Sequence, residues 1–417
     1  MNRKIFPHKI NLRVVSWAFY DFANTIFSMN IITLYFALWV TVDKGGRDIY
    51  YSIAFSLSML IAAVLEPVLG AFSDKVGLKK PFLAFFTFLC CIFTALIGMF
   101  DTLLYGLMFF VVANTGFQLA NVFYNALMSR VSKQENIGRV SGFGVGLGYV
   151  GSILGLLMVK PFVSHFGTQG AFVPTGILFF IFALPCLLLV REEKADKVFS
   201  FENFLEHSTA RIHETLGQIR QNRNIQRIFL LGAFFLSAVY TIILFMGVYS
   251  IKVMGFGQNE IITFFIVCSF FSIASAFVFG QLIDRANVFN VFKGILLLWI
   301  VGLMLAVLAF QQWIFWIAGA VIGVCLSATW VLCRVMIIQL SPEEKLGEYF
   351  GIFGLLSKFS AMIGSLLWGC VVWGFEFLGI FRYKIAIGIQ ILFVALALWM
   401  TSKVNLKILS KGQEDDE

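Results

Sequence analysis

Twelve apolar runs, each long enough to cross a lipid bilayer as a helix, constrain the fold of this chain more than any other feature. A helix needs about 20 apolar residues to span the hydrocarbon core. Within that core, only helices and closed barrels satisfy all of their backbone hydrogen bonds. The runs predict membrane spans at residues 14–42, 51–73, 81–100, 103–127, 141–163, 171–190, 227–253, 259–283, 292–310, 313–338, 349–373 and 382–402. We therefore expect an all-α membrane protein with twelve transmembrane helices.

The composition supports a membrane protein and argues against a nucleic-acid-binding one. Of the 417 residues, 59% are hydrophobic and 13% are charged, whereas soluble proteins are about half apolar and about a quarter charged. The net charge of +8 does not come from a basic soluble domain. Its lysines and arginines fall in short segments between the apolar runs, where they set the topology.

The positive charges predict that both termini lie in the cytoplasm. With twelve spans, the two termini share one side of the membrane, and cytoplasmic loops carry an excess of lysine and arginine. Most of the 31 lysine and arginine residues fall on the side of the termini. The opposite segments contain only Lys44, Arg47, Lys160, Lys252, Arg382 and Lys384. We expect a multi-pass protein of the cell (inner) membrane.

The chain consists of two related halves. Residues 69–75, after the second span, are matched by residues 279–285, after the eighth, at an offset of 210. Residues 132–142 are matched by residues 341–351 at an offset of 209. Two separate matches at nearly one offset predict two six-helix pseudo-symmetric bundles. Parallel repeats of this kind rock about a central site.

The repeat divides the chain into four segments. We predict an N-terminal six-helix bundle over residues 1–190, a linker over 191–226, a C-terminal bundle over 227–402 and a cytoplasmic tail over 403–417. In the linker, apolar residues recur at helical spacing with charges between them, at Phe201, Phe204, Leu205, Ile212, Leu216 and Ile219. The linker is either an amphipathic helix on the cytoplasmic membrane surface or a solvated connection, and neither supplies a catalytic domain.

The loop after the second span carries the sequence GAFSDKVGLKK at residues 70–80. This stretch resembles the loop signature of the major facilitator superfamily, G-x-x-x-D-[RK]-x-G-[RK]-[RK]-[RK]. It departs from the signature at Leu78, where a basic residue is usual. A shorter copy at residues 280–285 keeps the glycine, the aspartate and the arginine. The resemblance covers the whole chain and implies the two-bundle fold of that superfamily.

The same resemblance implies a gating role for the motif residues. These are Gly70, Asp74, Lys75, Gly77, Lys79, Lys80, Gly280, Asp284 and Arg285. Gly70 permits helix backbones to approach closely, and Asp74 ends the second span beside several lysines. Such a charge cluster can latch the bundles in one conformation and release them in the other. The alternative is that the lysines are only topology charges beside a helix end.

A narrower resemblance begins in the first span. WAFYDFANT at residues 17–25 is similar to the W-x-x-Y-D-x-A-N-[ST] opening of one subfamily. That subfamily contains the fungal autophagy-related vacuolar amino-acid effluxers and many bacterial relatives. Residues 138–151, and Phe350-Gly351 followed by Lys358 and Gly364, also fit it. The resemblance implies a secondary active transporter with amino acids as candidate substrates, while the short loops and tails leave the substrate open.

Two carboxylates, Asp21 and Glu66, lie well inside predicted spans, where a charge is expensive. Asp21 lies about 12 Å into the first span, eight residues beyond Arg13, and Asn24 shares its face. We expect this face to line a central cavity. Asp21 then either gates the cytoplasmic end through a structural bond or carries a coupling proton, and its depth favours the gate. Glu66 lies equally deep in the second span and either carries a proton or pairs with a cation.

Four amides form one face of the fourth span, namely Asn114, Gln118, Asn121 and Asn125. Their spacing of four, three and four residues keeps them on one side of a helix. The face either lines a water-filled path or bonds to a neighbouring helix, and we favour the path. Amides suit a polar solute that is zwitterionic or uncharged.

Arg334 and Lys358 are the two cations that the sequence places most clearly inside predicted spans. Arg334 occupies the repeat position of Asn125 and could clamp a carboxylate through two hydrogen bonds. Either cation could serve substrate binding or coupling. The alternatives are an ion pair with Asp21 or Glu66, or snorkelling of the side chain to the cytoplasmic surface.

Glycines in the fifth span predict close helix packing, because several recur at four-residue spacing, such as Gly144, Gly148, Gly151 and Gly155. They do not form a nucleotide loop, since no strand precedes them and no Walker lysine follows.

The sequence carries no motif of a membrane-embedded enzyme. It lacks H-E-x-x-H, G-x-S-x-G and any carboxylate cluster with metal-ligand spacing. We therefore expect a secondary active transporter of a small polar solute, with protons as a candidate coupling ion. It needs no metal or cofactor and works in the lipid bilayer as a monomer. The alternatives are a facilitator of lipids or other solutes, and a non-transporting receptor or scaffold.

Overall fold

The computed structural model describes residues 12–76, 78–100, 102–131, 137–190, 223–283, 286–340 and 346–403. The elements assigned within these ranges are helices. Twelve of the helical stretches are long and apolar enough to cross a membrane. The predicted all-α fold with twelve spans is therefore confirmed, and its span limits agree with the sequence to within a few residues. The predicted amphipathic residues 201–219 lie outside the described ranges.

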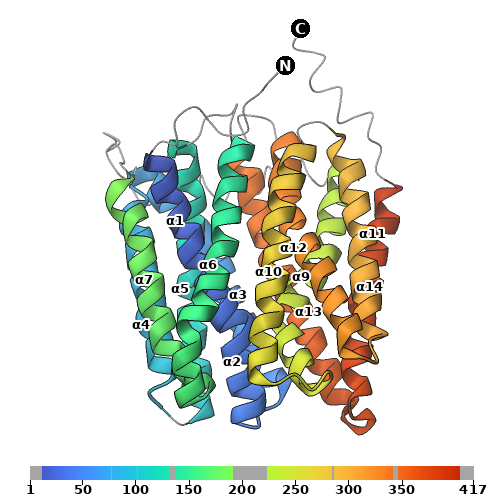
Figure 1. Cartoon of the computed structure of the whole chain (residues 1–417). Coiled ribbons are helices and arrows are strands. Elements are labelled where there is room, and N and C mark those ends of the chain that lie inside the picture. Colours follow the sequence, from blue (N-terminus) through green and yellow to red (C-terminus); the bar gives the residue numbers. More distant parts are fainter. Residues whose placement is uncertain are drawn as a thin grey trace.

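Each predicted span corresponds to one helical stretch of the structure (Figure 1). The first span consists of α1 (Leu12–Phe27), η1 (Ser28–Tyr35), α2 (Phe36–Leu38) and η2 (Trp39–Asp43). The rest of the first half contains α3 (Asp48–Val76), α4 (Lys80–Ile97), α5 (Leu103–Val131), α6 (Ile137–Phe166) and α7 (Phe172–Leu189). The second half contains α9 (Arg223–Lys252), α10 (Gln258–Ile283), α11 (Val288–Val307), α12 (Gln312–Leu340), α13 (Leu346–Gly374) and α14 (Phe381–Thr401).

The first span is less regular than its sequence suggests. Two of its segments, η1 and η2, are π-helical, with hydrogen bonds from residue i to i+5. The Tyr51 hydroxyl donates to the carbonyl oxygen of Ile32 within η1 at 2.6 Å. Short apolar runs carry no signal for such wide turns, so the sequence predicts an ordinary helix there. Wide turns of this kind occur often at functional sites.

The helices form two bundles, drawn in blue to green and in yellow to red in Figure 1. In the first bundle, α1 packs against α6 and α7, and α4 packs against α5. In the second, α9 packs against α13 and α14, and α10 packs against α12. The main contacts between bundles are those of α3 with α13 and of α6 with α10. The predicted arrangement of two six-helix bundles thus describes the molecule.

The spans connect two faces of the molecule. The terminal side is the one at which α1 begins and α14 ends, and it is uppermost in Figure 1. The opposite side is the one reached by the end of η2 and the start of α3. Because consecutive spans alternate in direction, α9 begins on the terminal side and ends on the opposite side at Lys252.

Matching glycine seams hold equivalent helices together in the two bundles. A Cβ atom on Gly151 of α6 would lie 2.4 Å from the carbonyl oxygen of Phe22 in α1. A Cβ atom on Gly364 of α13 would lie 2.4 Å from the carbonyl oxygen of Ser237 in α9. Since Gly364 is the repeat equivalent of Gly155, also on α6, the two seams are related by the internal repeat. The close packing predicted for the fifth span is confirmed.

Candidate functional site

A cavity of about 300 Å³ lies between the two bundles. Small-molecule sites span roughly 300–1,000 Å³, so this one suits a small solute. Its polar lining includes Asp21, Asn24, Gln118, Asn121, Tyr149, Tyr240, Ser269 and Arg334. Its apolar lining includes Met29, Phe55, Met59, Phe117, Phe264, Phe265 and Trp330. The charged residues gather toward the terminal side, and the phenylalanines of α3 and α10 lie toward the opposite side.

An aromatic stack fixes α1 against α5 beside this cavity. The rings of Trp17 and Tyr20 each stack on Tyr124, with ring centroids 4.8 Å apart. The Trp17 indole nitrogen donates to the Tyr124 carbonyl oxygen at 3.2 Å. The hydroxyls of Tyr20 and Thr87 lie 2.5 Å apart. These buried contacts set the rotation of α1 about its axis, and hence the direction in which Asp21 points.

Asp21 and Asn24 lie one turn apart and both line the cavity. The Asn24 amide nitrogen donates to the Asn121 side-chain oxygen at 2.5 Å. The remaining acceptors, Asp21 Oδ2 and Asn24 Oδ1, are buried and have no hydrogen-bond partner among the described residues. The Tyr124 hydroxyl is close to Asp21, but it also has no hydrogen-bond partner among the described residues. Free buried acceptors beside a cavity suit a ligand that donates hydrogen bonds, such as an ammonium group.

Arg334 contributes a positive charge from the second bundle to the same cavity. It lies on α12, and its Nη1 donates to the Ser141 hydroxyl of α6 across the boundary between bundles. Its guanidinium also attracts the Asp21 carboxylate. The side chain therefore belongs to the cavity wall and does not snorkel toward lipid headgroups. An anion and a cation on different walls of one cavity form a dipolar site.

Lys358 pairs with Glu66 across the contact between α13 and α3. The two side chains are only 10% and 14% exposed. Gly354 makes room for this pair, because a Cβ atom there would lie 3.1 Å from Glu66 Oε1. Of the ion pairs considered from the sequence, the structure has this one, while Asp21 and Arg334 line the same cavity. Neither member of the Glu66–Lys358 pair lines the cavity.

The amide face of α5 divides between two roles. Gln118 and Asn121 line the cavity, as expected of a path. Asn114 is fully buried and donates to the Ser58 hydroxyl of α3 at 2.7 Å, so the prediction that it lines the path is wrong. The reason is that α3 covers α5 at that depth. Asn125 is exposed and is not part of the cavity lining.

The loop motif of the first half is only partly described. The side chains of Asp74 and Lys75, and the whole of Gly77, Asp284 and Arg285, lie outside the described residues. Lys79 and Lys80 are partly buried at the start of α4. Among the described residues, no atom would lie within 4 Å of a Cβ atom on Gly70 or Gly280. The close backbone approach expected at Gly70 is therefore not found among the described residues in this conformation.

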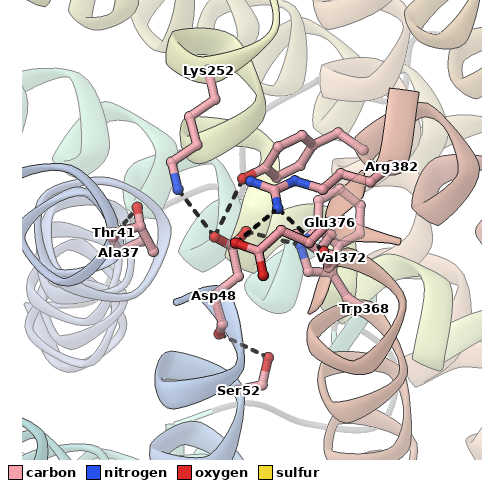
Figure 2. Close-up of polar contacts among 10 residues, drawn as sticks. Ala37, Thr41, Asp48, Ser52, Lys252, Trp368, Val372, Glu376 and Arg382 are labelled. Carbon is pink, nitrogen blue, oxygen red and sulfur yellow. Dashed lines mark hydrogen bonds and ion pairs between the residues drawn. The ribbon is translucent and has the colours of Figure 1, made fainter. Parts of the chain in front are cut away.

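Asp48 is a functional candidate that the sequence analysis missed. It lies at the first turn of α3 on the opposite side, where donors from the second bundle surround it (Figure 2). Its side chain is 3% exposed, and its Oδ1 lies 3.1 Å from Lys252 Nζ. The Trp368 indole nitrogen donates to Oδ2 and the Tyr383 hydroxyl donates to Oδ1, both at 3.4 Å. A signal was present, since an acid that opens span two and a base that closes span seven must lie on one side.

Comparisons with known sequences agree with this architecture. The family model of the Major Facilitator Superfamily matches residues 20–365. An "Uncharacterized MFS-type transporter YxiO" from Bacillus subtilis is 25% identical over 372 residues, covering 84% of this chain and 86% of that one. "Autophagy-related protein 22" from Kluyveromyces lactis is 21% identical over 370 residues, covering 79% of this chain and 74% of that one.

Solved structures share the fold at low sequence identity. The crystal structure of a mutant of the nucleoside transporter NupG superposes with a TM-score of 0.74 at 14% identity, covering 94% of this chain and all (100%) of that one. A bacterial homolog to the human lysosomal transporter Spinster, in an inward-facing and occupied conformation, gives a TM-score of 0.68 at 15% identity. That match covers 94% of this chain and 97% of the other.

Proposed function

This chain belongs to the Major Facilitator Superfamily, and on that premise we propose that it is a secondary transporter of small zwitterions of the amino-acid class. One observation carries the proposal. Asp21 and Asn24 lie on one wall of the cavity, each with a buried acceptor that has no hydrogen-bond partner among the described residues, and Arg334 lies on another wall. An α-ammonium group would donate to the first wall. An α-carboxylate would accept two parallel hydrogen bonds from Arg334.

The rest of the cavity favours an apolar side chain on that zwitterion. Beyond the charged end, the lining passes to methionine and phenylalanine side chains, including Met59, Phe55 and Phe264. A polar side chain placed there would lose its hydrogen bonds to water without replacement. The similarity of residues 17–25 to the amino-acid effluxer subfamily points to the same substrate class.

Proton coupling is assigned to Glu66 in this proposal. Its partner Lys358 belongs to the other bundle, so rocking of the bundles separates the pair. Asp21 is left to substrate binding, because it lines the cavity and Glu66 does not. A proton carried by Glu66 would thus move with the conformational cycle.

The terminal side is proposed to be cytoplasmic, in a cell (inner) membrane, because most lysines and arginines lie there. The loop at 70–80 would then act as the cytoplasmic gate, as its resemblance to the superfamily motif implies. Residues 1–190 and 227–402 form the two moving bodies, joined by the linker at 191–226. The transporter acts as a monomer in this account, in which both bundles of the chain contribute to the cavity wall.

Reconstituted protein tests the proposal. Proteoliposomes that contain a pH-sensitive dye would receive amino acids, sugars, nucleosides and lysolipids one at a time. Uptake of apolar amino acids that is lost in Asp21→Asn is the expected result. Asp43→Asn is the matched control, because Asp43 is exposed and accepts a hydrogen bond from Thr168 of its own bundle. Transport of a sugar, nucleoside or lysolipid without amino-acid transport would contradict the proposal.

A further inference from the structure

We propose that Asp48 is the gate of the opposite side, and that the cavity opens there only when Asp48 releases Lys252, Trp368 and Tyr383. All three partners belong to the second bundle, whereas Asp48 belongs to the first. Asp48 does not line the cavity. The inference concerns the path to the cavity, so it holds whichever solute is carried.

The contacts beneath Asp48 form a plug between it and the cavity. The Tyr51 ring of α3 meets the Phe245 ring of α9 edge-on, with centroids 5.7 Å apart. The Phe245 ring in turn stacks on Trp368 of α13 at 5.0 Å. One further turn inward, the Ser56 and Ser365 hydroxyls lie 3.0 Å apart. These layers close the opposite side.

The Asp48 cluster, which consists of Asp48, Lys252, Trp368 and Tyr383, is the layer most able to change between a closed and an open state. A hydroxyl pair loses little when water replaces it, and ring contacts resist opening only through the apolar area that they bury, whereas a buried carboxylate without its cation is strongly unfavourable. Lys252 is 23% exposed, so its ammonium group lies at the edge of water and can be solvated once the bundles part. The cluster is therefore stable when fully closed or fully hydrated, and unfavourable between the two.

Neighbouring charges do not replace this contact. Glu376 approaches Arg47 at 3.7 Å and Arg382 at 3.8 Å (Figure 2 shows the second pair). Glu376 is 54% exposed and Arg47 is 51% exposed, and ion pairs in water contribute little. Among the described residues, the Asp48–Lys252 pair is the buried charge contact between bundles on this side.

The native Cys268 supplies a reporter for the gate. Its side chain lines the cavity and is partly exposed. Cys370, which is exposed on α13, would first be changed to serine. A membrane-impermeant methanethiosulfonate added from the opposite side then reaches Cys268 only when that side opens. Thr102→Cys, in the exposed turn between α4 and α5 on the opposite side, identifies which face of a vesicle the reagent meets.

Labelling rates from the opposite side are the measurement. Asp48→Asn and Lys252→Met are each expected to raise the Cys268 labelling rate by about tenfold or more, because coupling across buried charge pairs is strong. The double variant Asp48→Asn with Lys252→Met removes both charges of the pair. It therefore avoids the unpaired buried charge that could make a single variant misfold. Asp43→Asn, on the same side but bonded within its own bundle, should label at the wild-type rate.

The proposal fails if the folded double variant labels Cys268 from the opposite side as slowly as the wild type does. It also fails if Asp43→Asn raises the rate as much as Asp48→Asn, because the effect would then come from general loosening of that surface. Neither outcome depends on transport of an amino acid. Failure of the proposed substrate and failure of the gate are therefore distinguishable.

Discussion

Asp48 and Glu66 lie on the same face of α3, and each pairs with a lysine of the second bundle. They are 18 residues apart, which is five helical turns or about 27 Å. Lys252 of α9 meets the first, and Lys358 of α13 meets the second. One helix is thus joined to the other bundle by an ion pair near each end. Rocking that opens the opposite side separates the Asp48–Lys252 pair and leaves the Glu66–Lys358 pair in place. Rocking that opens the terminal side does the reverse.

The Glu66–Lys358 ion pair predicts that the effects of two substitutions on stability are not additive. Lys358→Met leaves Glu66 as an uncompensated, largely buried charge, which destabilises a protein by about 3–5 kcal/mol. Adding Glu66→Gln removes that charge, so the double variant should recover much of the loss. Thermal unfolding in detergent measures both. A double variant less stable than Lys358→Met would show that the two groups are not coupled as the structure indicates.

Replacing Arg334 with lysine is expected to weaken substrate binding. A lysine keeps the charge but cannot form two parallel hydrogen bonds with a carboxylate. Arg334→Lys should raise KM by about tenfold, equivalent to about 1.4 kcal/mol. Arg382→Lys, on the opposite side and outside the cavity, is the control and should leave KM unchanged. Equal KM values for wild type and Arg334→Lys would remove Arg334 from the substrate site.

The glycine seam predicts a sharp difference between two alanine substitutions on α6. Gly151→Ala places a methyl group where a Cβ atom would lie 2.4 Å from a backbone oxygen of α1. The clash should destabilise the protein by about 1–3 kcal/mol. Gly146→Ala should be close to neutral, because its nearest neighbour is a Phe277 ring carbon at 3.6 Å. Equal melting temperatures for the two variants would contradict the observed packing.

The divided amide face of α5 predicts that two alanine substitutions act on different properties. Asn114→Ala removes a buried bond to Ser58 and should lower stability by about 0.5–1.5 kcal/mol with little change in KM. Gln118→Ala alters the cavity wall and should change KM while stability stays near wild type. Melting curves together with uptake kinetics separate the two. The reverse pattern would assign Asn114 to the path after all.

Much of the fold follows from the sequence, because span length and charge asymmetry are local properties. The apolar runs predict the twelve helices, and the glycine spacing in α6 predicts its seam with α1. The π-helical turns of η1 escape prediction, since no side-chain pattern marks them. The close approach expected at Gly70 is not found among the described residues, because a glycine permits close packing without specifying which helix meets it.

The site is harder to predict, because its residues come together only through the packing of distant helices. Asp21 and Arg334 stand out as charges in apolar runs, and they do share a cavity. The choice of Glu66 as the partner of Lys358 depends on which helix faces α13. Asp48 lies at a span boundary, where charges are common, so the sequence places it on the same side as Lys252 but does not show that three donors bury it.

Competition by three related compounds tests most directly the claim that the cavity holds both ends of a zwitterion. Uptake of radiolabelled leucine into proteoliposomes would be measured against leucine, leucinamide, which lacks the carboxylate, and 4-methylpentanoate, which lacks the amine. If Asp21 with Asn24 and Arg334 each bind one end, leucine should compete at least about tenfold better than either analogue, since each lost charged hydrogen bond is worth about 1.5–3 kcal/mol. Equal competition by all three would show that the apolar side chain alone is recognised, and would contradict the account.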